Sequence, residues 1–143
     1  MTVKAILDEK GRDVVTISAG ETLGNAAALL ARKRIGAAVV VKPDGSIEGI
    51  LSERDIVRAV AERKGACLDD AVSSVMTAKV KTCTETSTIN DVMEIMTAGR
   101  FRHLPVAENG KLIGIISIGD VVKKRIEDVV READEIRNYI AAG

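Results

Sequence analysis

The sequence predicts a mixed α/β fold, of the α+β kind, made of two pseudo-symmetric βαββα units packed together and an extended C-terminal helix. Residues 14–35 resemble residues 80–101, and residues 47–55 resemble residues 112–120. Helical and strand-like patterns follow one another in the same order in both halves. A repeat of this length indicates duplicated units that bury their apolar faces against each other, so a ligand site in one half should have a counterpart in the other.

Composition narrows the class of protein. The 143 residues suit one compact globular unit, and 21 basic and 21 acidic residues leave no net charge. A nucleic-acid surface normally needs a basic face, so we expect no nucleic-acid partner. No apolar stretch is long enough for a membrane span and the N-terminus lacks a signal-peptide layout, so we expect no membrane association and a cytoplasmic location.

The residues do not predict an enzyme. The sequence has no evident nucleophile–base pair, no phosphate-loop glycine pattern and no cluster of metal ligands. His103 is the only histidine, which argues against a metal site built on imidazoles. Cys67 and Cys83 have neither metal-ligand spacing nor a disulfide framework, and Cys83 aligns with Ile17, as expected of a core residue.

Each half is predicted to open with a short lead-in helix, at residues 3–7 and 72–76, and an extended segment, at residues 14–17 and 80–83. A helix follows, and Thr22 and Thr88 mark its start with a pattern similar to a capping box. Apolar residues then recur with helical spacing in both copies: Leu23, Ala26, Ala27 and Leu30, and Ile89, Val92, Met93 and Met96. Gly99 is the expected C-cap of the second copy.

Two strands and a second helix complete each half. The apolar run 37–41 predicts a buried strand, and turns at Pro43-Asp44-Gly45 and Asn109-Gly110 predict hairpins. The second helix is expected to begin at Ser52 or Ser117, and Gly65 to end it in the first copy. The predicted division is a first repeat with its lead-in at 1–65, a linker at 66–71, a second repeat at 72–130 and a helical extension at 131–143.

Three motifs suggest a family. They are Gly-Ile-Leu-Ser-Glu-Arg-Asp at 49–55, Gly-Ile-Ile-Ser-Ile-Gly-Asp at 114–120, and Arg-His-Leu-Pro-Val at 102–106. Their positions, twice in register after a hairpin and before a helix, resemble a tandem pair of cystathionine-β-synthase (CBS) domains, a Bateman module, over residues 3–130. The resemblance implies a disc of two units that binds adenosine-containing ligands between them and regulates rather than catalyses. AMP and NAD(H) rank first as ligands, followed by ADP and ATP.

The resemblance also implies the site residues, because each cleft joins the Ser-x-x-Asp of one repeat to the middle strand of the other. The first cleft would combine Ile50, Ser52 and Asp55 with Lys81, Arg102, His103 and Pro105. The second would combine Ile115, Ser117 and Asp120 with Val15, Gly36, Ala37 and Val39.

The chemistry of these residue types fits such a ligand. An ionised Asp55 or Asp120 accepts hydrogen bonds from both hydroxyls of a ribose, and the helix N-termini beside them favour an anion. Arg54 and Arg102 are the expected phosphate partners, because a guanidinium matches phosphate oxygens in pairs. The alternative is that Ser-x-x-Asp is only a capping motif, and the two roles are compatible.

The two predicted clefts differ. The first half has Gly36-Ala37-Ala38-Val39 where the second has residues 102–105, and the second has Gly119 in place of Arg54. We therefore expect the Asp55 cleft to prefer a phosphorylated ligand. The smoother Asp120 cleft would hold a bulkier ligand such as a dinucleotide or stay empty. Arg54 would reach across the pseudo-twofold axis to the phosphate of a ligand in that cleft. Pro105 is expected at an edge or a strand start, where no ladder hydrogen bond is lost.

The C-terminal helix carries a second pattern. An apolar seam with heptad spacing runs along it: Val122, Ile126, Val129, Ala133, Ile136 and Ile140. We expect a homodimer formed through this seam and the CBS faces; the alternative is a helix packed on its own disc. The predicted function is an adenine-nucleotide sensor that signals to a partner protein, and the alternative is a ligand-independent dimerisation scaffold.

Overall fold

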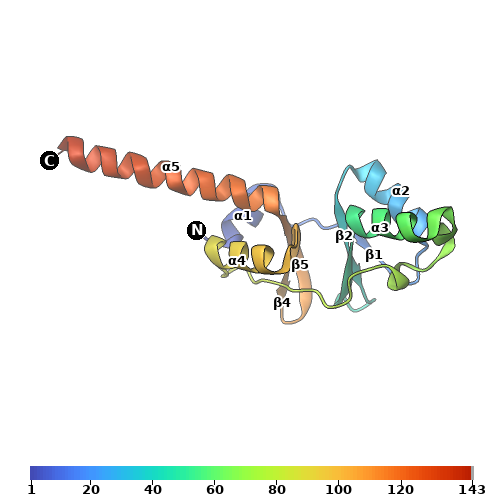
Figure 1. The fold of residues 1–143 in the computed structure, drawn as a ribbon. Helices are drawn as coiled ribbons and strands as arrows, with labels where there is room; N and C mark the ends of the chain where they lie inside the picture. Colours follow the sequence, from blue (N-terminus) through green and yellow to red (C-terminus); the bar gives the residue numbers. More distant parts are fainter. Residues whose placement is uncertain (143) are drawn as a thin grey trace.

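A computed structural model describes residues 1–142 and confirms the mixed α/β fold, while Gly143 lies outside the described residues. The first half contains β1 (Thr16–Ile17), α2 (Leu23–Lys33), β2 (Ala37–Val41), β3 (Ile47–Ser52) and α3 (Glu53–Arg63). The second contains α4 (Ile89–Gly99), β4 (His103–Glu108), β5 (Lys111–Ser117) and α5 (Ile118–Ala142). Helix α1 (Val3–Lys10) precedes both, and the 3₁₀ helices η1 (Lys64–Asp69) and η2 (Val72–Ser74) connect them (Figure 1).

The predicted helix starts are confirmed, but the predicted C-caps are wrong. Thr22 and Thr88 accept hydrogen bonds from backbone N–H groups at the starts of α2 and α4, at 3.2 and 3.0 Å. Gly99 is still helical, and Arg100 takes the left-handed conformation at φ 56°. Gly99 instead leaves room for the ring of Phe101, which a β-carbon would overlap. Helix α3 ends at Arg63, and its C-cap is Lys64, at φ 56°, one residue before the predicted Gly65.

Pro105 explains why the two sheets differ. In the first half, β1 adds to the β2–β3 hairpin in parallel, and Val39 donates its N–H to the Val15 carbonyl at 3.2 Å. Pro105 occupies the corresponding place in β4 and has no N–H to donate. Parallel pairing there shrinks to a single bridge between Cys83 and Val106 beside the β4–β5 hairpin. Pro105 is the third residue of β4, which is an edge strand of a two-stranded sheet, so the expected edge position is confirmed.

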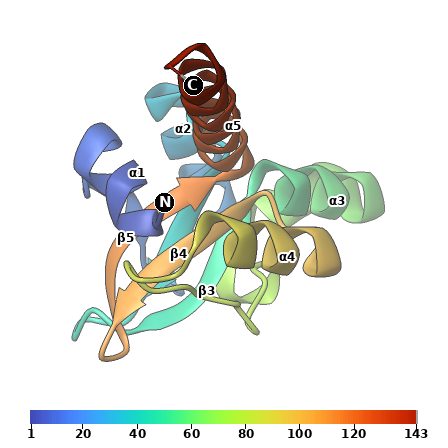
Figure 2. The same cartoon turned by 90° about the vertical axis from the view of Figure 1, so that its left-hand side faces the viewer.

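Each lead-in segment packs into the core of the other half. Val3, Ile6 and Leu7 of α1 are buried with residues of α4, β4 and β5, in the second half. Figures 1 and 2 show α1 next to β5. Val72, together with the partly buried Val75 and Met76 next to it, packs into the core of the first half. Sequence order places residues 1–10 with the first repeat, but packing places them on the second, so the two units interlock.

Helix α5 packs on the body only near its start and then extends away from it (Figure 1). Its buried positions are Val121, Lys124 and Asp128, whereas the predicted seam lies on another face. Ile126 is 58% exposed and Ile136 is 61% exposed. The alternative in which the seam packs on its own disc is therefore wrong.

Within residues 1–142, no helix combines the length and the apolar character that crossing a membrane requires.

Candidate functional site

A cavity of about 710 Å³ lies between the two halves at the start of α3. Its walls come from the β3–α3 junction, from the end of α4 and from the start of β4. The lining residues are Gly36, Ile50, Ser52, Glu53, Arg54, Asp55, Val57, Arg58, Thr77, Gly99, Arg100, Phe101, Arg102 and His103. We call it the Asp55 cleft. Its size falls in the range of small-molecule sites.

Asp55 is held by a capping box at the start of α3. The Ser52 backbone N–H donates to Asp55 Oδ2 at 3.0 Å, and the Asp55 N–H donates to Ser52 Oγ at 3.2 Å. The second carboxylate oxygen, Oδ1, has Arg58 Nη1 at 3.6 Å, and the Asp55 side chain is 8% exposed. The capping interpretation is thus confirmed, and it leaves Oδ1 as the acceptor that a ligand hydroxyl would use.

Positive charge gathers in this cleft. Arg54, Arg58, Arg100 and Arg102 line it together with two carboxylates, Glu53 and Asp55. The arginines come from the first turns of α3 and from the loop that joins α4 to β4, so both halves contribute. A guanidinium binds phosphate oxygens through paired hydrogen bonds. The cleft therefore suits a ligand that carries a phosphate group and a hydroxyl pair.

His103 fits against Gly36. A β-carbon on Gly36 would lie 3.1 Å from His103 Cε1, so a glycine at this position makes room for the ring. Burial lowers the pKa of His103 below its ordinary 6.5, and the positive charge of Lys10 lowers it further. The ring is therefore neutral near pH 7 and able to accept or donate a single hydrogen bond in the cleft.

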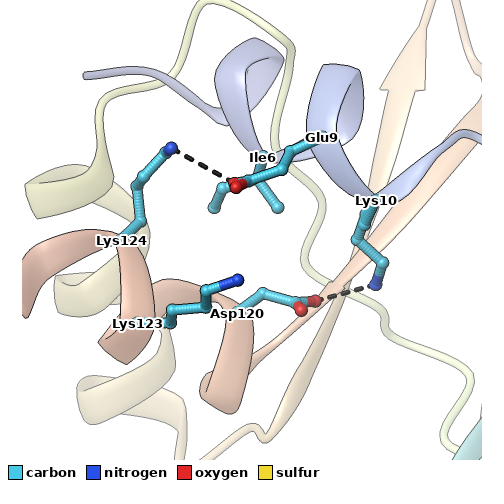
Figure 3. Close-up of a pocket in the computed structure, with 6 residues that line it drawn as sticks. All are labelled: Ile6, Glu9, Lys10, Asp120, Lys123 and Lys124. Atoms are coloured by element: carbon cyan, nitrogen blue, oxygen red, sulfur yellow. Dashed lines mark hydrogen bonds and ion pairs between the residues drawn. The ribbon is translucent and has the colours of Figure 1, made fainter. Parts of the chain in front are cut away.

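The second Ser-x-x-Asp has different surroundings. A small cavity of about 130 Å³ lies at Asp120, lined by Ile6, Glu9, Lys10, Asp120, Lys123 and Lys124. Lys10 Nζ is 2.7 Å from Asp120 Oδ2 (Figure 3). The Ser117 N–H donates to the same oxygen at 2.9 Å, and Ser117 Oγ accepts from the Asp120 N–H at 3.1 Å.

The structure brings together most of the residues predicted for the first cleft. Ile50, Ser52, Asp55, Arg102 and His103 all line it. Arg54, expected as a phosphate partner that reaches across to the second cleft, also lines the first. Lys81 is exposed and Pro105 is buried in β4, and neither lines this cavity. Gly36 was assigned to the second cleft and instead lines the first.

Of the other residues predicted for the second cleft, only Asp120 lines the cavity there. Ala37 and Val39 are buried in β2, Val15 packs against the first core, and Ile115 and Ser117 are half-buried in β5.

Sequence reasoning missed residues in both places. In the Asp55 cleft these are Glu53, Val57, Arg58, Thr77, Gly99, Arg100 and Phe101. The signal for Arg58 was available, since it lies one helical turn after Arg54 on an assigned helix. Lys10 and Thr77 could be found only by knowing that the lead-in segments exchange cores.

Metal binding and thiol chemistry have little support in residues 1–142. No group of three His, Cys, Asp or Glu side chains there is placed to hold a metal ion. Both cysteines are free and buried, and burial raises the pKa of Cys83 to about 12, so its thiol stays protonated.

Comparison with known proteins identifies the family. The model of the CBS domain matches residues 3–62 and again residues 72–127. The crystal structure of a CBS-domain containing protein from Agrobacterium tumefaciens is 54% identical, with a TM-score of 0.84 over 87% of this chain and 99% of that one. The chain belongs to the CBS domain family and carries the domain as a tandem pair.

Two further relatives widen the comparison. A CBS domain protein from Pyrobaculum aerophilum, solved in complex with AMP, is 31% identical, covers 84% of this chain and 89% of its own, and has a TM-score of 0.75. A mitochondrial CBS domain-containing protein of Arabidopsis thaliana is 29% identical over 99% of this chain and 73% of its own length.

Proposed function

We propose that this protein is a regulatory sensor of adenine nucleotides, that the ligand binds in the Asp55 cleft, and that binding is signalled to a partner protein. AMP is the first candidate, ahead of NAD(H), ADP and ATP. The single observation that carries the proposal is the meeting of Asp55 with four arginines in one cavity between the halves. The relative solved in complex with AMP supports the choice of ligand. The cytoplasmic location and the absence of catalysis stay predictions.

The proposed contacts follow from the geometry. The ribose hydroxyls donate to Asp55, whose Oδ1 is not used by the capping box. The phosphate meets Arg54 and Arg102, which approach from different halves. A ligand of about two dozen non-hydrogen atoms at ~0.3 kcal/mol per atom binds with roughly 7 kcal/mol, which corresponds to an affinity of about 10 µM. Such an affinity suits a reporter of metabolite level.

The test is calorimetric titration of nucleotide-free protein with AMP and with adenosine. Asp55→Ala should weaken both ligands about tenfold or more, because a hydrogen bond to a charged group contributes roughly 1.5–3 kcal/mol. Asp91→Ala is the matched control. Asp91 forms the same capping box with Thr88 at the start of α4 and does not line the cleft. Equal affinities in the two variants would contradict the proposal.

A second variant distinguishes protein contacts to the phosphate from contacts to the nucleoside. Arg102→Ala should weaken AMP and leave adenosine unchanged, because its guanidinium is proposed to meet only the phosphate. The same titration with ADP, ATP, NAD⁺ and NADH ranks the ligands. A protein that binds none of these ligands would favour the second candidate function.

That second candidate is a dimerisation scaffold, and the exposed seam of α5 favours it. The seam residues include Ile126, Ile136 and Ile140, which are 58%, 61% and 71% exposed. A second copy of this helix is the proposed occupant. In a parallel pair, heptad spacing places Glu132 of one copy opposite Arg137 of the other, so charge also favours the pairing. Dimerisation is compatible with nucleotide sensing.

Sedimentation of two double variants tests the seam. Ile126→Gln with Ile136→Gln should shift the protein to the monomer, because it removes two apolar layers. Glu127→Gln with Glu135→Gln, one position away on the same helix, should leave the oligomeric state unchanged. If both variants sediment like the unmodified protein, α5 does not form the interface.

A further inference from the structure

Helix α1 reaches the carboxylate of the second Ser-x-x-Asp. Lys10, its last residue, places Nζ 2.7 Å from Asp120 Oδ2 and 3.1 Å from the Ile115 carbonyl oxygen (Figure 3). The two side chains are 36% and 26% exposed, so solvent only partly screens the ion pair. The ammonium group thus lies beside the carboxylate, on the same oxygen that the Ser117 N–H uses, and neutralises the charge that would attract a ribose hydroxyl.

The first cleft has a different arrangement at the corresponding point. There Thr77 forms a backbone bridge with Ile50, with N···O distances of 3.0 and 2.9 Å. The reason lies in the lead-ins: η2 is a 3-residue turn that leaves the chain extended at Thr77, whereas α1 stays helical for 8 residues. The Lys10 side chain therefore bonds the Ile115 carbonyl as the Thr77 N–H bonds that of Ile50.

The site at which the Lys10 ammonium takes the place of the Thr77 N–H is also the smaller of the two. The cavity at Asp55 has a volume of about 710 Å³, and the cavity at Asp120 about 130 Å³. Burial raises the pKa of Asp120, but hydrogen bonds from Lys10 and Ser117 outweigh it and hold that pKa below 3.8. Asp120 is thus an ionised carboxylate that already has its counter-ion within the chain.

We infer that Lys10 is a tethered cation that closes the Asp120 site to nucleosides, so that each chain takes its ligand only at Asp55. The inference rests on the proposed function, because it assumes that the Ser-x-x-Asp carboxylate binds ribose. A nucleoside has to compete with this ammonium for the Asp120 carboxylate, whose Oδ1 corresponds to the Oδ1 that the capping box leaves available at Asp55. Adenosine carries no phosphate that could hold the displaced ammonium, so it should be excluded most strongly.

Calorimetric titration with adenosine and with AMP tests this inference on the full chain. The unmodified protein should bind one adenosine per chain. Lys10→Met, which keeps the length of the side chain and removes its charge, should bind a second one as well, because the affinity of the Asp120 site for adenosine should rise about tenfold or more. Lys10→Arg should still bind one, because it keeps the cation. Lys4→Met is the control, since Lys4 pairs with Asp8 on the exposed face of α1.

The second site must also depend on its carboxylate. Lys10→Met combined with Asp120→Ala should return the stoichiometry to one, at Asp55. If Lys10→Met alone binds a single adenosine, or if it weakens AMP as the loss of a phosphate ligand would, the inference is overturned.

The same titrations separate this inference from the proposed function. Adenosine bound only by Lys10→Met, in an Asp120-dependent way, would overturn the Asp55 proposal and support the role of Lys10. Binding by neither protein would overturn both.

Discussion

Leu7 offers a direct test of the exchanged lead-in segments. Its side chain is fully buried in the core of the second half, and one of its methyl carbons, Cδ2, would lie 2.8 Å from a β-carbon on Gly114 of β5. Leu7→Ala removes a buried isopropyl group from this contact between α1 and β5. Such a substitution costs about 2–5 kcal/mol, and the upper half of that range applies where backbone on both sides prevents collapse. For a chain of this size, about 4 kcal/mol lowers the Tm by roughly 14 °C.

The location of the damage matters more than its size. Hydrogen exchange should show lost protection first in β4 and β5, with β2 and β3 less affected. Val72→Ala is the reciprocal variant and should affect β2 and β3, at a cost of roughly 2 kcal/mol. Lys4→Ala on the exposed face of α1 should leave the Tm nearly unchanged. If Leu7→Ala exposes β2 and β3 first, α1 belongs to the first half and the assignment of the cores is refuted.

Two further predictions concern pH and the wall of the Asp55 cleft. Because the pKa of His103 is lowered in the folded protein, the unfolded chain binds a proton more readily than the folded one below pH 6.5. The free energy of unfolding should therefore fall as the pH drops from 6.5. His103→Gln should remove this part of the pH dependence measured by urea unfolding. The charged groups that act on the ring are Lys10, Glu53, Asp120 and Arg102. Gly49→Ala would place a β-carbon 2.7 Å from Met76 Sδ and the Thr77 carbonyl oxygen, so it should cost about 1–3 kcal/mol in thermal unfolding and weaken AMP binding. Gly20→Ala meets nothing within 4 Å and should be neutral; equal effects of the two would argue against the close packing at Gly49.

The elements of the fold were predictable where a local pattern determined them. Thr22 and Thr88 begin helices because a hydroxyl can accept a backbone N–H, and that depends only on the next three residues. Because each pattern occurs in both halves, each prediction was supported twice. The ends of the helices were harder to predict. At Arg100 the left-handed turn is stabilised by a hydrogen bond from the Phe101 N–H to the Met96 carbonyl, at 3.0 Å, so glycine was not required.

The candidate site was predictable only in part, because long-range packing decides which segments meet. Ser52 and Asp55 lie in a local motif, and the resemblance to a CBS pair placed them with Arg102 and His103 of the other half, which line the same cavity. Lys10 and Thr77 belong to lead-in segments that resemble each other in sequence but fold as an α-helix and as a short 3₁₀ turn. Nothing local to Lys10 indicates that its side chain reaches Asp120, since the two residues are far apart in the chain and meet only after the cores exchange.

The inequality of the two clefts therefore has two separate origins. Substitutions within the repeat put Arg102 and Arg54 around Asp55, where the other half has Gly36 and Gly119, and these differences are visible in the aligned repeats. The third difference, the Lys10 ammonium at the second carboxylate, arises from the length of a helix outside the aligned strands. Helix α1 also carries Val3, Ile6 and Leu7 of the second core, so one helix contributes both to that core and, through its last residue, to the second carboxylate. A ligand that displaces Lys10 would act on α1 and so on the packing of β5 and α5. We therefore expect occupancy of the second site to depend on a helix that is also part of the second core.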